Sequence, residues 1–449
     1  MPATLRLTFD FLLGKLRKSF LAMPDNRSGK NISYTIPDAA SCAFSVFFTQ
    51  EPSFLSYQKR MQERYGVSNE KTVFGVKEIP SDTQIRRLLD EVPAKVLNGV
   101  FWDSVDYLKQ AGQLEHFRTE VGEKDLLVAL DGTWYFSSSD IHCSNCLRKT
   151  YEGEKTYYHA MINPVIAVPG KTQVIPLPPE FIKNTDGDKK QDCEQNGAKR
   201  WIRKHGRKLS KMKVTILGDD LYAHQPICEE LLKVGFNFIL VCKEDSHKTL
   251  YEWINGICEE VKVEKITGVR KVTKETWVYR FVNGVPIRDE KDTNDRVLLV
   301  NFCEITIMDE DGKRKYHNAF VTNHLITAEN VEQISACGRA RWKIENENNN
   351  TLKNQGYHLE HNFGHGRKHL ASLLAILNIL SFLFHTILEI MDLTYQAVRR
   401  KSGRRDTLFN GIRTLLSLIC FKSFASLMEF MLGHKRIQHI DIENIPVPI

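Results

Sequence analysis

Three acidic residues that lie far apart in the chain have the types and positions of metal ligands. Asp131 follows the apolar residues of DLLVALDGTW, and Asp219 follows those of KVTILGDDLY. Glu345 lies four residues after Arg341 in Arg339–Lys353, a stretch whose pattern predicts one helix. Carboxylates from separate elements suit Mg²⁺ or Mn²⁺, and two such ions stabilise both the attacking and the leaving oxygen at phosphorus. These residues therefore predict a two-metal site for phosphoryl transfer on nucleic acid.

Each of these acids also has a plainer interpretation. A lone aspartate at a strand end is usually a turn or cap residue. Glu345 and Arg341 have the spacing of a common helical ion pair, which contributes little to stability. Asp219 is followed by Asp220, and because neighbours at a strand end point to opposite faces, only one of them can face a shared site. Glu347 lies about 200° around a helix from Glu345, so the same choice applies there. Spacing alone leaves both choices open.

Two basic stretches are candidates for contact with phosphate. The first is KRWIRKHGRKLSKMK at 199–213, a helix face that can follow a nucleic-acid backbone or simply be a solvated helix end. The second is HLEHNFGHGRKH at 358–369, which follows the Glu345 helix and suggests contact with flanking DNA, with a metal cluster as the alternative. The candidate DNA-binding residues are Lys199, Arg200, Arg203, Lys204, Arg207, Lys208, Arg367 and Lys368.

The motif HCSNC, which follows the first acid, is a candidate zinc site. It supplies His142, Cys143 and Cys146, and Cys193 or His159 would complete a set of four ligands. A single CxxC without a second pair does not define a zinc site, so reduced, packed thiols are the favoured interpretation. Ten cysteines in 449 residues are too few for a disulfide scaffold, and the basic N-terminus has no cleavage-type site. We therefore expect reduced thiols and a cytoplasmic protein.

Composition limits the class of protein without defining its function. A chain of 449 residues predicts two to four domains, and its 42% hydrophobic and 26% charged residues are ordinary for a soluble globular protein. The formal net charge of +7 permits a polyanionic partner but does not establish one.

One apolar segment, Leu370–Leu393, is long enough to cross a bilayer. However, Asn378, Ser381, His385 and Glu389 follow one another at spacings of 3, 4 and 4 residues, which places them in one polar stripe on a helix. Such a stripe is costly in lipid. The segment therefore predicts a helix packed on protein, and we expect no association with a membrane.

The expected elements change in kind at about residue 120. Residues 1–120 are predicted to be helical, either as a DNA-binding domain or as a scaffold for the next domain. Residues 121–257 predict three strands, a helix, a strand, a helix and a strand. The first three strands are expected to form an antiparallel meander, and the last two to pair in parallel through a right-handed crossover. The first strand then lies beside the fourth, which brings Asp131 and Asp219 together.

The remaining segments predict a β-rich insertion and two further helical parts. Residues 258–326 contain short strands separated by charged turns. Residues 327–365 return to the core and include the helix with Glu345, and residues 366–449 are helical and rather apolar.

Three blocks of sequence resemble the catalytic blocks of bacterial insertion-sequence transposases of the DDE type. The blocks are LDGTW, LGDDLYAHQP and RWKIENENNNTLKNQGY, and they fall within residues 120–365. The resemblance is to the cut-and-paste group with a β-rich insertion and a Tyr-Arg-Glu-Lys signature on the last helix. Arg341 and Glu345 match this signature. Lys353 lies one position later than the usual pattern, and no Tyr stands at the expected place before Arg341.

This resemblance implies an RNase H-like, retroviral-integrase-like core and the activity of a DNA transposase. Asp131, Asp219 and Glu345 would bind two Mg²⁺ or Mn²⁺ ions, and Asp219 is preferred to Asp220 because an aromatic residue follows it three positions later. Arg341 and Lys353 would orient a phosphate or the glutamate. The protein would bind the terminal inverted repeats of its element, cleave DNA and join the 3′-hydroxyl ends to target DNA, as a dimer on DNA in the bacterial cytoplasm.

Two alternatives keep the fold but change the function. A nuclease of the same fold would cleave DNA without strand transfer. A transposase-derived DNA-binding protein would bind DNA without catalysis and would keep its function when Asp131 is replaced by alanine.

Overall fold

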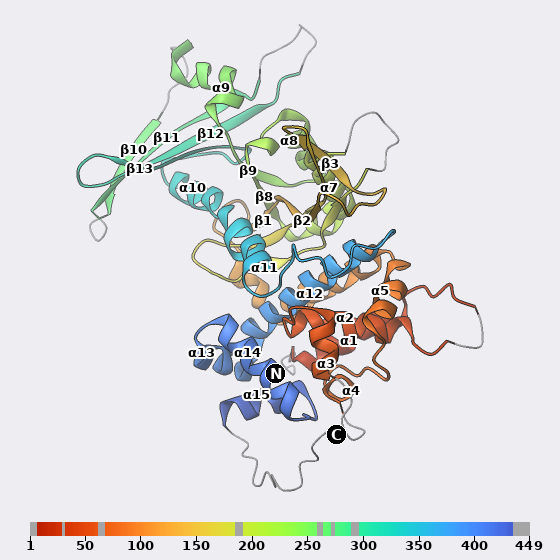
Figure 1. The fold of residues 1–449 in the computed structure, drawn as a ribbon. Helices are drawn as coiled ribbons and strands as arrows, with labels where there is room; N and C mark the ends of the chain where they lie inside the picture. Colours follow the sequence, from red (N-terminus) through yellow and green to blue (C-terminus); the bar gives the residue numbers. More distant parts are fainter. Residues whose placement is uncertain are drawn as a thin grey trace. The chain divides into compact units, whose positions relative to one another are not determined.

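The computed structural model describes residues 7–28, 32–61, 68–184, 192–257, 264–270, 274–288 and 296–433. It is a mixed α/β structure with a large mixed sheet and helical segments toward both ends of the chain (Figure 1). The chain divides into two compact units. The first consists of Met1–Val100, Gln355–His358 and His369–Ile449, and the second of Phe101–Asn354 and Leu359–Lys368.

The first unit is helical and combines segments from both ends of the chain in one core. Its described helices are α1 (Phe9–Leu21), α2 (Ile36–Phe48), α3 (Phe54–Met61), α4 (Asn69–Thr72), α5 (Asp82–Asp90), η1 (Ala94–Leu97), α12 (Leu370–Met391), α13 (Leu393–Ser402), α14 (Arg405–Leu418) and α15 (Phe424–Leu432). The ring centroid of Phe424 lies 4.6 Å from that of Phe9 and 5.3 Å from that of Phe48. Helices α1, α2 and α15 therefore share one aromatic core.

Local sequence signals explain where several of these helices begin. The hydroxyl oxygens of Thr8, Thr35 and Ser81 accept hydrogen bonds from backbone N–H groups in the first turns of α1, α2 and α5. Such caps satisfy donors that have no partner within the helix.

Helix α12 has the length and hydropathy of a membrane span, and 94% of its most apolar window is buried inside the protein. Its polar stripe contacts protein groups. Asn378 Nδ2 donates to Tyr357 O at 2.7 Å, and His385 Nδ1 lies 2.7 Å from Tyr357 Oη. Glu389 pairs with Arg405 at 3.1 Å. The expectation of a helix packed on protein is confirmed, and such burial is typical of the core helix of a soluble protein.

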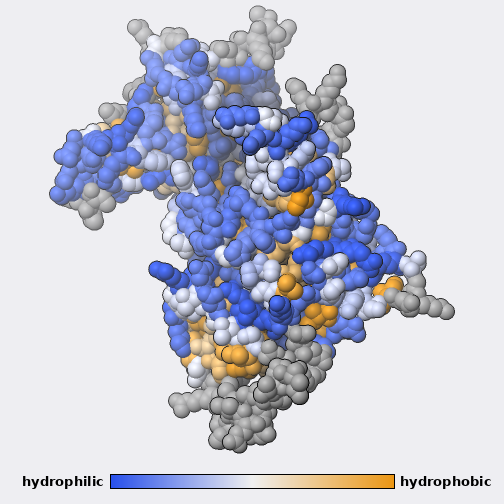
Figure 2. Space-filling model, in the orientation of Figure 1, coloured by the Kyte–Doolittle hydropathy of each residue, from blue (hydrophilic) through white to orange (hydrophobic). Residues whose placement is uncertain are grey.

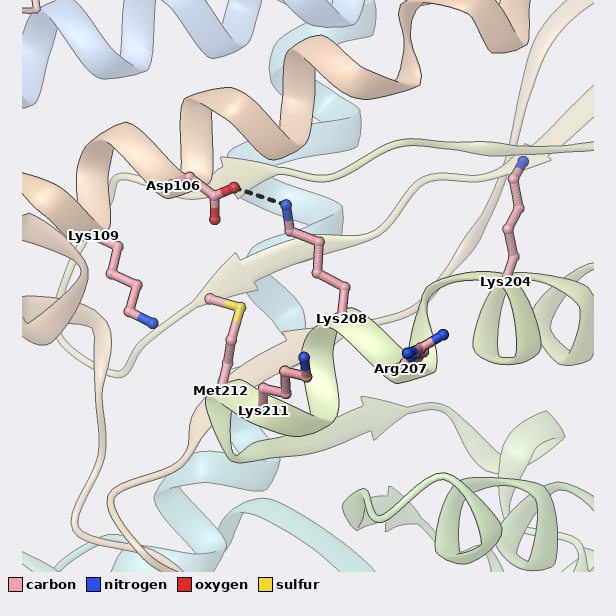
Figure 3. A pocket seen from close by; sticks show the side chains of 7 residues that line it. All are labelled: Asp106, Lys109, Lys204, Arg207, Lys208, Lys211 and Met212. Atoms are coloured by element: carbon pink, nitrogen blue, oxygen red, sulfur yellow. Dashed lines mark hydrogen bonds and ion pairs between the residues drawn. The ribbon is translucent and has the colours of Figure 1, made fainter.

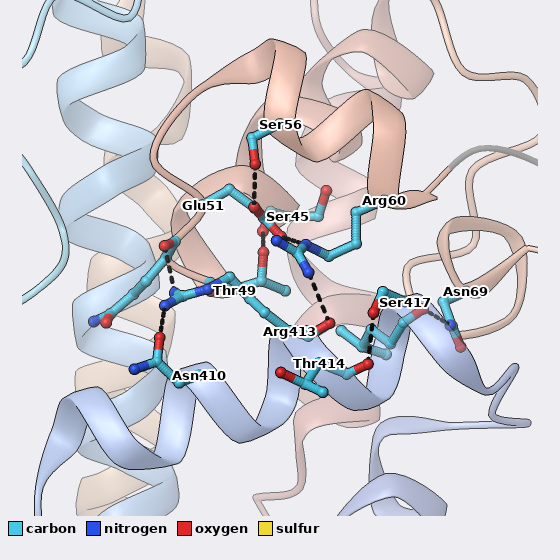
Figure 4. A network of polar contacts seen from close by, with 12 residues as sticks. Ser45, Thr49, Glu51, Ser56, Arg60, Asn69, Asn410, Arg413, Thr414 and Ser417 are labelled. Carbon is cyan, nitrogen blue, oxygen red and sulfur yellow. Dashed lines mark hydrogen bonds and ion pairs between the residues drawn. The ribbon is translucent and has the colours of Figure 1, made fainter.

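A polar network joins α14 to the chain after α2 (Figure 4). Arg413 Nη1 donates to Thr49 O at 3.1 Å and to Gln50 O at 2.6 Å. Arg60 Nε lies 2.6 Å from Glu51 Oε1, and the Glu51 side chain is fully buried. A buried carboxylate needs such a partner, because removal of one member of a buried pair leaves an uncompensated charge.

The second unit is built on two sheets. Its described strands are β1 (Leu126–Ala129), β2 (Gly132–Ser138), β3 (Leu147–Tyr151), β4 (Glu154–Ile162), β5 (Val165–Ala167), β6 (Ile175–Pro176), β7 (Glu180–Ile182), β8 (Val214–Gly218), β9 (Asn237–Val241), β10 (Glu264–Arg270), β11 (Glu275–Pro286), β12 (Leu299–Met308) and β13 (Arg314–Thr322). The large sheet has the order β10-β11-β12-β13-β9-β8-β1-β5-β6. A smaller sheet, which the sequence did not predict, has the order β2-β4-β3, with β7 also paired to β4.

The centre of the large sheet agrees with the expected strand order. Strand β1 pairs in parallel with β8 and antiparallel with β5, and β8 pairs in parallel with β9. The residues of β1 and β8 are all buried, as in strands covered on both faces. Figure 1 shows α7 and α8 on one side of these strands and α10 on the other.

Strands β1 and β2 are two halves of one bent strand. They pair with β5 and β4 in the same antiparallel register from Leu127 to Trp134, after which the register shifts by one residue, and Asn163 N donates to Asp131 O at 3.0 Å between the two ladders. Asp131 therefore occupies the bend at which the chain leaves the large sheet for the small one.

The segment predicted as a β-rich insertion contains β10 to β13, although part of it lies outside the described residues. These strands form an antiparallel meander, and β13 pairs antiparallel with β9. The insertion therefore extends the large sheet on the β9 side.

The second unit has helices before, between and after these strands. They are α6 (Asn98–Gln110), η2 (Gln113–Phe117), α7 (Glu194–Leu209), η3 (Ser210–Met212), η4 (Asp220–Tyr222), α8 (Gln225–Lys233), η5 (Glu244–Ser246), α9 (Lys248–Glu252), η6 (Trp253–Ile257), α10 (Val331–Arg339), η7 (Ile344–Asn349) and α11 (Asn350–Asn354). The prediction of one helix over Arg339–Lys353 is correct for Trp342–Lys353 and wrong at Ala340 and Arg341, which form a turn. Helix α10 ends at Arg339, and the chain turns before it resumes as the π-helical η7 and then α11.

The C-terminal end of α10 packs closely on the sheet. Gly338 approaches the ring of Phe320 so closely that an added Cβ would lie 2.6 Å from it. Helix α10 is therefore in tight contact with β13 just before it ends at Arg339. The face of the second unit visible in Figure 2 is largely hydrophilic, with only small separate hydrophobic areas.

Candidate active site

The two predicted aspartates follow neighbouring parallel strands at the same level. Ala129 pairs with Leu217, and Leu130 N donates to Leu217 O at 2.8 Å. Asp131 and Asp219 each come two residues after this pair. Because neighbouring strands are about 4.8 Å apart, the backbones of the two aspartates lie side by side at the C-terminal ends of β1 and β8. This juxtaposition is the one that the strand order predicted.

A chain of side-chain amides connects Asp131 to η7. Its Oδ2 accepts from Asn349 Nδ2 at 3.0 Å, and Asn349 Oδ1 accepts from Asn163 Nδ2 at 3.1 Å. Asn348 Nδ2 also donates to Asn349 Oδ1 at 3.1 Å. The carboxylate of Asp131 is therefore held in one orientation by η7, the element that also carries Glu345.

The electrostatic environment of Asp131 and Asp219 favours a bound cation. The pKa of Asp131 is raised to about 7, chiefly by burial and then by the charge of Glu194; Arg341 opposes this rise, and Asp219 and Glu345 add to it. Burial likewise raises the pKa of Asp219 against the opposing effects of the Leu221 N–H and of Arg341. Acids that repel one another in a partly buried site bind a divalent cation readily, because the cation removes the repulsion.

The choice between the two neighbouring aspartates is supported by their contacts. Asp220 Oδ1 accepts from Lys243 N at 2.7 Å, and its Oδ2 accepts from Ser246 Oγ at 2.5 Å. Asp219 accepts from Leu221 N at 3.0 Å, which caps η4. Asp220 thus fixes the chain after β9, while Asp219 acts electrostatically on Asp131.

Three site residues were predicted within Arg339–Lys353, and each lies in a different environment. Glu345 lies on η7 and is exposed, and it acts on Asp131 through its charge. Arg341 is half-buried, its Nε is buried without a hydrogen-bond partner among the described residues, and its charge acts on both aspartates. Lys353 pairs with Glu360 at 2.8 Å. Arg341 is therefore the cation most directly coupled to the acids.

A fourth acid, Glu194, belongs to this group and was not predicted. Its Oε1 accepts from Gly132 N at 3.1 Å and from Tyr222 Oη at 2.7 Å. A Cβ added at Gly132 would lie 2.3 Å from Glu194 Oε2, so a larger residue there would displace the Glu194 carboxylate. Among charged groups, Glu194 has the largest effect on Asp131. An acid in the first turn of a helix is common, so the sequence carried no distinct signal for it.

Most predicted DNA-binding residues of α7 already have acidic partners. Arg200 pairs with Asp192 and Glu180, and Arg203 pairs with Glu230. The Nζ of Lys204 lies 3.4 Å from Glu180, while Lys199 is half-buried and acts on Glu230 through its charge. Surface ion pairs of this kind contribute little to stability, so their basic side chains can leave the acidic partner and contact phosphate instead.

The C-terminal end of α7 lines a basic groove of about 520 Å³ (Figure 3). Lys208 pairs there with Asp106 at 2.8 Å, and Arg207 is exposed. The groove also contains Lys109 and Lys211. Its excess of positive charge suits a phosphate backbone.

A second groove, of about 550 Å³, runs beside η7. Its lining includes Arg339, Trp342, Lys343 and Glu347. The indole of Trp342 is 46% exposed, and the Arg341 guanidinium lies 5.8 Å from its centroid. Aromatic and basic side chains next to the acids suit contact with a base and a phosphate.

The candidate zinc residues are only partly those of the motif. Cys143 and Cys146 lie together with His159 and His365, and the four ligand atoms are within 4.8 Å of one another, so the cluster could hold a metal such as Zn²⁺. The proposed ligand His142 is exposed outside the cluster, where its ring stacks on that of Tyr157.

The histidine-rich segment supplied the unpredicted fourth member, His365. Cys193, the other suggested ligand, is exposed at the start of α7. Arg367 and Lys368 follow His365 and are exposed, and Lys368 O accepts from Asn145 Nδ2 at 3.1 Å. Both predicted DNA contacts therefore lie next to the cluster.

The pKa values of the two thiols are shifted in opposite directions. Burial acts to raise the pKa of Cys143, but hydrogen bonds from His159 and His365 lower it to about 5. Burial raises the pKa of Cys146 to about 11.

Comparisons with known proteins identify no family for this chain. No protein-family model matches it, and no curated protein matches it.

Proposed function

We propose that this protein is a DDE-type DNA transposase with an RNase H-like catalytic core. The observation that carries the proposal is the pairing of β1 with β8, which puts Asp131 and Asp219 side by side, next to a late helix whose Asn349 binds Asp131. Each acid comes from a different element of the chain, and together they can supply the shared carboxylate ligands of a two-metal site.

The strand order supports the proposed fold. Within the large sheet, β6, β5 and β1 are antiparallel neighbours, and β1, β8 and β9 are parallel neighbours. An RNase H-like core has this order, with acids after its first and fourth strands. Strands β10 to β13 then correspond to the β-rich insertion of the resembled transposases.

The proposed chemistry assigns a role to each residue of the site. Asp131, Asp219 and Glu345 are the proposed ligands of two Mg²⁺ or Mn²⁺ ions, which would stabilise charge on the attacking and leaving oxygens. Arg341 holds the scissile phosphate close to these acids. Asn349 orients Asp131.

The proposed partner is DNA, and the protein acts as a dimer on it. Joining two ends in one reaction requires both ends together, so each protomer would bind one terminal inverted repeat. The basic groove at Lys109, Arg207 and Lys211 and the groove at Trp342 are the proposed contact surfaces. A bacterial cytoplasm is the proposed location, since the substrate is chromosomal DNA.

The experiment uses the DNA that flanks the gene as substrate. The full-length protein, with Mg²⁺ or Mn²⁺ and a target plasmid, is expected to cleave the flanking segments and to join their 3′-ends to the plasmid. Asp131→Asn and Asp219→Asn are expected to bind these segments with unchanged affinity but to lose cleavage.

The outcomes separate the alternatives. Cleavage without joined products assigns the protein to the nucleases. Binding of the flanking DNA without cleavage by the wild-type protein assigns it to the inactive DNA-binding proteins. Absence of both binding and cleavage overturns the proposal.

A paired substitution tests which glutamate completes the site. Glu345→Gln is expected to reduce cleavage at least as much as Asp219→Asn. Glu194→Gln is expected to leave measurable cleavage, because its carboxylate is held by Gly132 and Tyr222. The opposite ranking would transfer the ligand role to Glu194.

A further inference from the structure

Four side chains at one edge of the second unit have the arrangement of a tetrahedral metal site. Cys143 Sγ lies 3.9 Å from Cys146 Sγ and 3.6 Å from His159 Nε2. Cys146 Sγ lies 3.5 Å from His159 Nε2 and 3.4 Å from His365 Nε2, and the two Nε2 atoms are 3.1 Å apart.

These separations match the edges of a tetrahedron around zinc. With Zn–S near 2.3 Å and Zn–N near 2.05 Å, ideal edges are about 3.8 Å for S–S, about 3.6 Å for S–N and about 3.3 Å for N–N. The five distances above lie close to these values, and all four atoms lie within 4.8 Å of one another. Each side chain offers the atom that binds zinc: two Sγ and two Nε2.

Direct hydrogen bonding explains this cluster poorly. Cys146 Sγ is close to Cys143 Sγ and to both imidazole Nε2 atoms, yet a thiol has only one proton to donate. Two Nε2 atoms 3.1 Å apart attract only when one is protonated and the other is not. A cation at the centre replaces all of these conflicting contacts with four favourable ones.

We infer that Cys143, Cys146, His159 and His365 form a closed structural zinc site. All four positions are taken by protein side chains, which distinguishes a structural site from a catalytic one with an open position. His365 Nδ1 lies 2.9 Å from Gly366 O, the type of outer contact that fixes the ring of a metal-binding histidine.

The site would fasten two distant parts of the second unit together. Cys143, Cys146 and His159 belong to the β3–β4 region, while His365 lies on the segment after α11, 219 positions from Cys146. A cross-link that closes so long a loop removes much freedom from the unfolded chain. It would also position Arg367 and Lys368, whether or not the protein is a transposase.

Metal content and coordination test this inference directly. The full-length protein, purified under reducing conditions without an affinity tag of histidines, is expected to contain one zinc per chain by elemental analysis. X-ray absorption at the zinc edge is expected to show two sulfur and two nitrogen neighbours, near 2.3 Å and about 2.0 Å. Replacement with Co²⁺ is expected to give the intense visible bands of tetrahedral coordination.

Variants with matched controls test the ligand set. Cys143→Ser and His365→Ala are expected to lose most of the bound zinc. Cys193→Ser and His142→Ala, which change exposed residues outside the cluster, are expected to keep one zinc per chain. If a ligand variant does not fold, the absorption spectrum of the wild-type protein still decides the question.

Three results would overturn the inference. The first is wild-type protein that stays free of metal after incubation with Zn²⁺. The second is bound zinc whose neighbours are oxygen and nitrogen without sulfur. The third is a stable Cys143–Cys146 disulfide under reducing conditions, which would make the pair a redox site.

Discussion

At the residue level, the two neighbouring aspartates after β8 have different partners. Asp220 accepts hydrogen bonds from Lys243 and Ser246, whereas Asp219 accepts only from Leu221 N among the hydrogen bonds of the described chain. A carboxylate that is already saturated by protein donors has little capacity left for a metal ion. The structural role therefore belongs to Asp220 and the proposed catalytic role to Asp219.

This difference leads to a prediction for a pair of isosteric substitutions. Asp219→Asn is expected to reduce DNA cleavage by more than about 100-fold, since ligand loss costs more than loss of an outer-shell partner. Asp220→Asn is expected to lower the free energy of unfolding by about 1–3 kcal/mol, because it weakens two hydrogen bonds, while cleavage persists. Cleavage assays and urea unfolding measure the two effects, and equal loss of cleavage in both variants would contradict the assignment.

A buried carboxyl in the first unit makes stability depend on pH. Glu70 is completely buried, and Ser45 Oγ donates to its Oε1 at 3.0 Å. Burial raises the pKa of Glu70 from 4.5 to about 8. In the unfolded chain this group ionises near pH 4.5, but in the folded protein it stays protonated until the pH approaches 8. The contribution of Glu70 to stability is therefore fully present below about pH 4.5 and is lost as the pH rises toward 8.

We expect the free energy of unfolding of the first unit to fall by a few kcal/mol between about pH 5 and pH 8. Glu70→Gln, which is neutral at every pH, is expected to remove most of this fall. Urea unfolding at several pH values measures it, with the exposed Glu78→Gln as the control. The same pH dependence in wild type and Glu70→Gln would show that other groups cause it.

The sequence identified some site residues and missed others for a physical reason. Asp131 and Asp219 follow buried apolar strands, and that local pattern is visible without a structure. Glu194, Asn349 and His365 act through partners at 28 or more positions along the chain. No local pattern records such partners, so these residues could be found only in the folded chain.

At the level of elements, η7 connects the late helix to the sheet. It is a π-helical segment, a form that is rare and often occurs at functional sites. Asn349 lies at its end and contacts both Asp131 and Asn163 through its amide. This geometry makes Asn349 a positioning residue, because it acts through Asp131.

Asn349→Ala is expected to reduce cleavage by about 10–100-fold, as for other outer-shell partners of a metal site. The affinity for Mn²⁺, measured by calorimetry, is expected to fall with it, because Asp131 loses its fixed orientation. The exposed neighbour Asn350→Ala is the control and is expected to change neither. Reduced cleavage with unchanged Mn²⁺ affinity would mean that Asn349 acts on DNA instead.

Elements were predicted well where periodicity is strong and poorly where packing decides. The core strands β1, β8 and β9 and the helices between them follow from apolar runs and turn signals. The small sheet was missed because β2 and β3 are partly exposed and polar, and because β4 and β5 were predicted as one strand over Tyr157–Val168. The break after Arg339 was missed because Ala340 and Arg341, which form the turn, are residues that also occur readily inside helices.

At the level of the whole molecule, the first unit combines the two ends of the chain. Sequence reasoning placed residues 1–120 and 366–449 in separate regions. In the structure, rings of Phe9, Phe48 and Phe424 pack in one core. Contacts between residues hundreds of positions apart leave no periodic signal, so their union could not be read from either segment.

This shared core leads to a prediction about cooperativity. Phe424→Ala removes a buried ring from the middle of the cluster and is expected to lower the free energy of unfolding of the first unit by about 3–5 kcal/mol. Because α1 and α2 pack on that ring, their amides are expected to exchange faster in hydrogen-exchange mass spectrometry, although they lie at the other end of the chain. Amides of β8 in the second unit are expected to be unchanged.

Phe430→Ala is the matched control, because this ring is on the same helix but only half-buried, with its ring contact to Phe421. It is expected to cause a smaller loss of stability and to leave exchange in α1 and α2 unchanged. Faster exchange confined to α15 in Phe424→Ala would show that the C-terminal helices fold separately from the N-terminal ones. Faster exchange in α1, α2 and α15 together would show that both ends of the chain unfold as one cooperative unit.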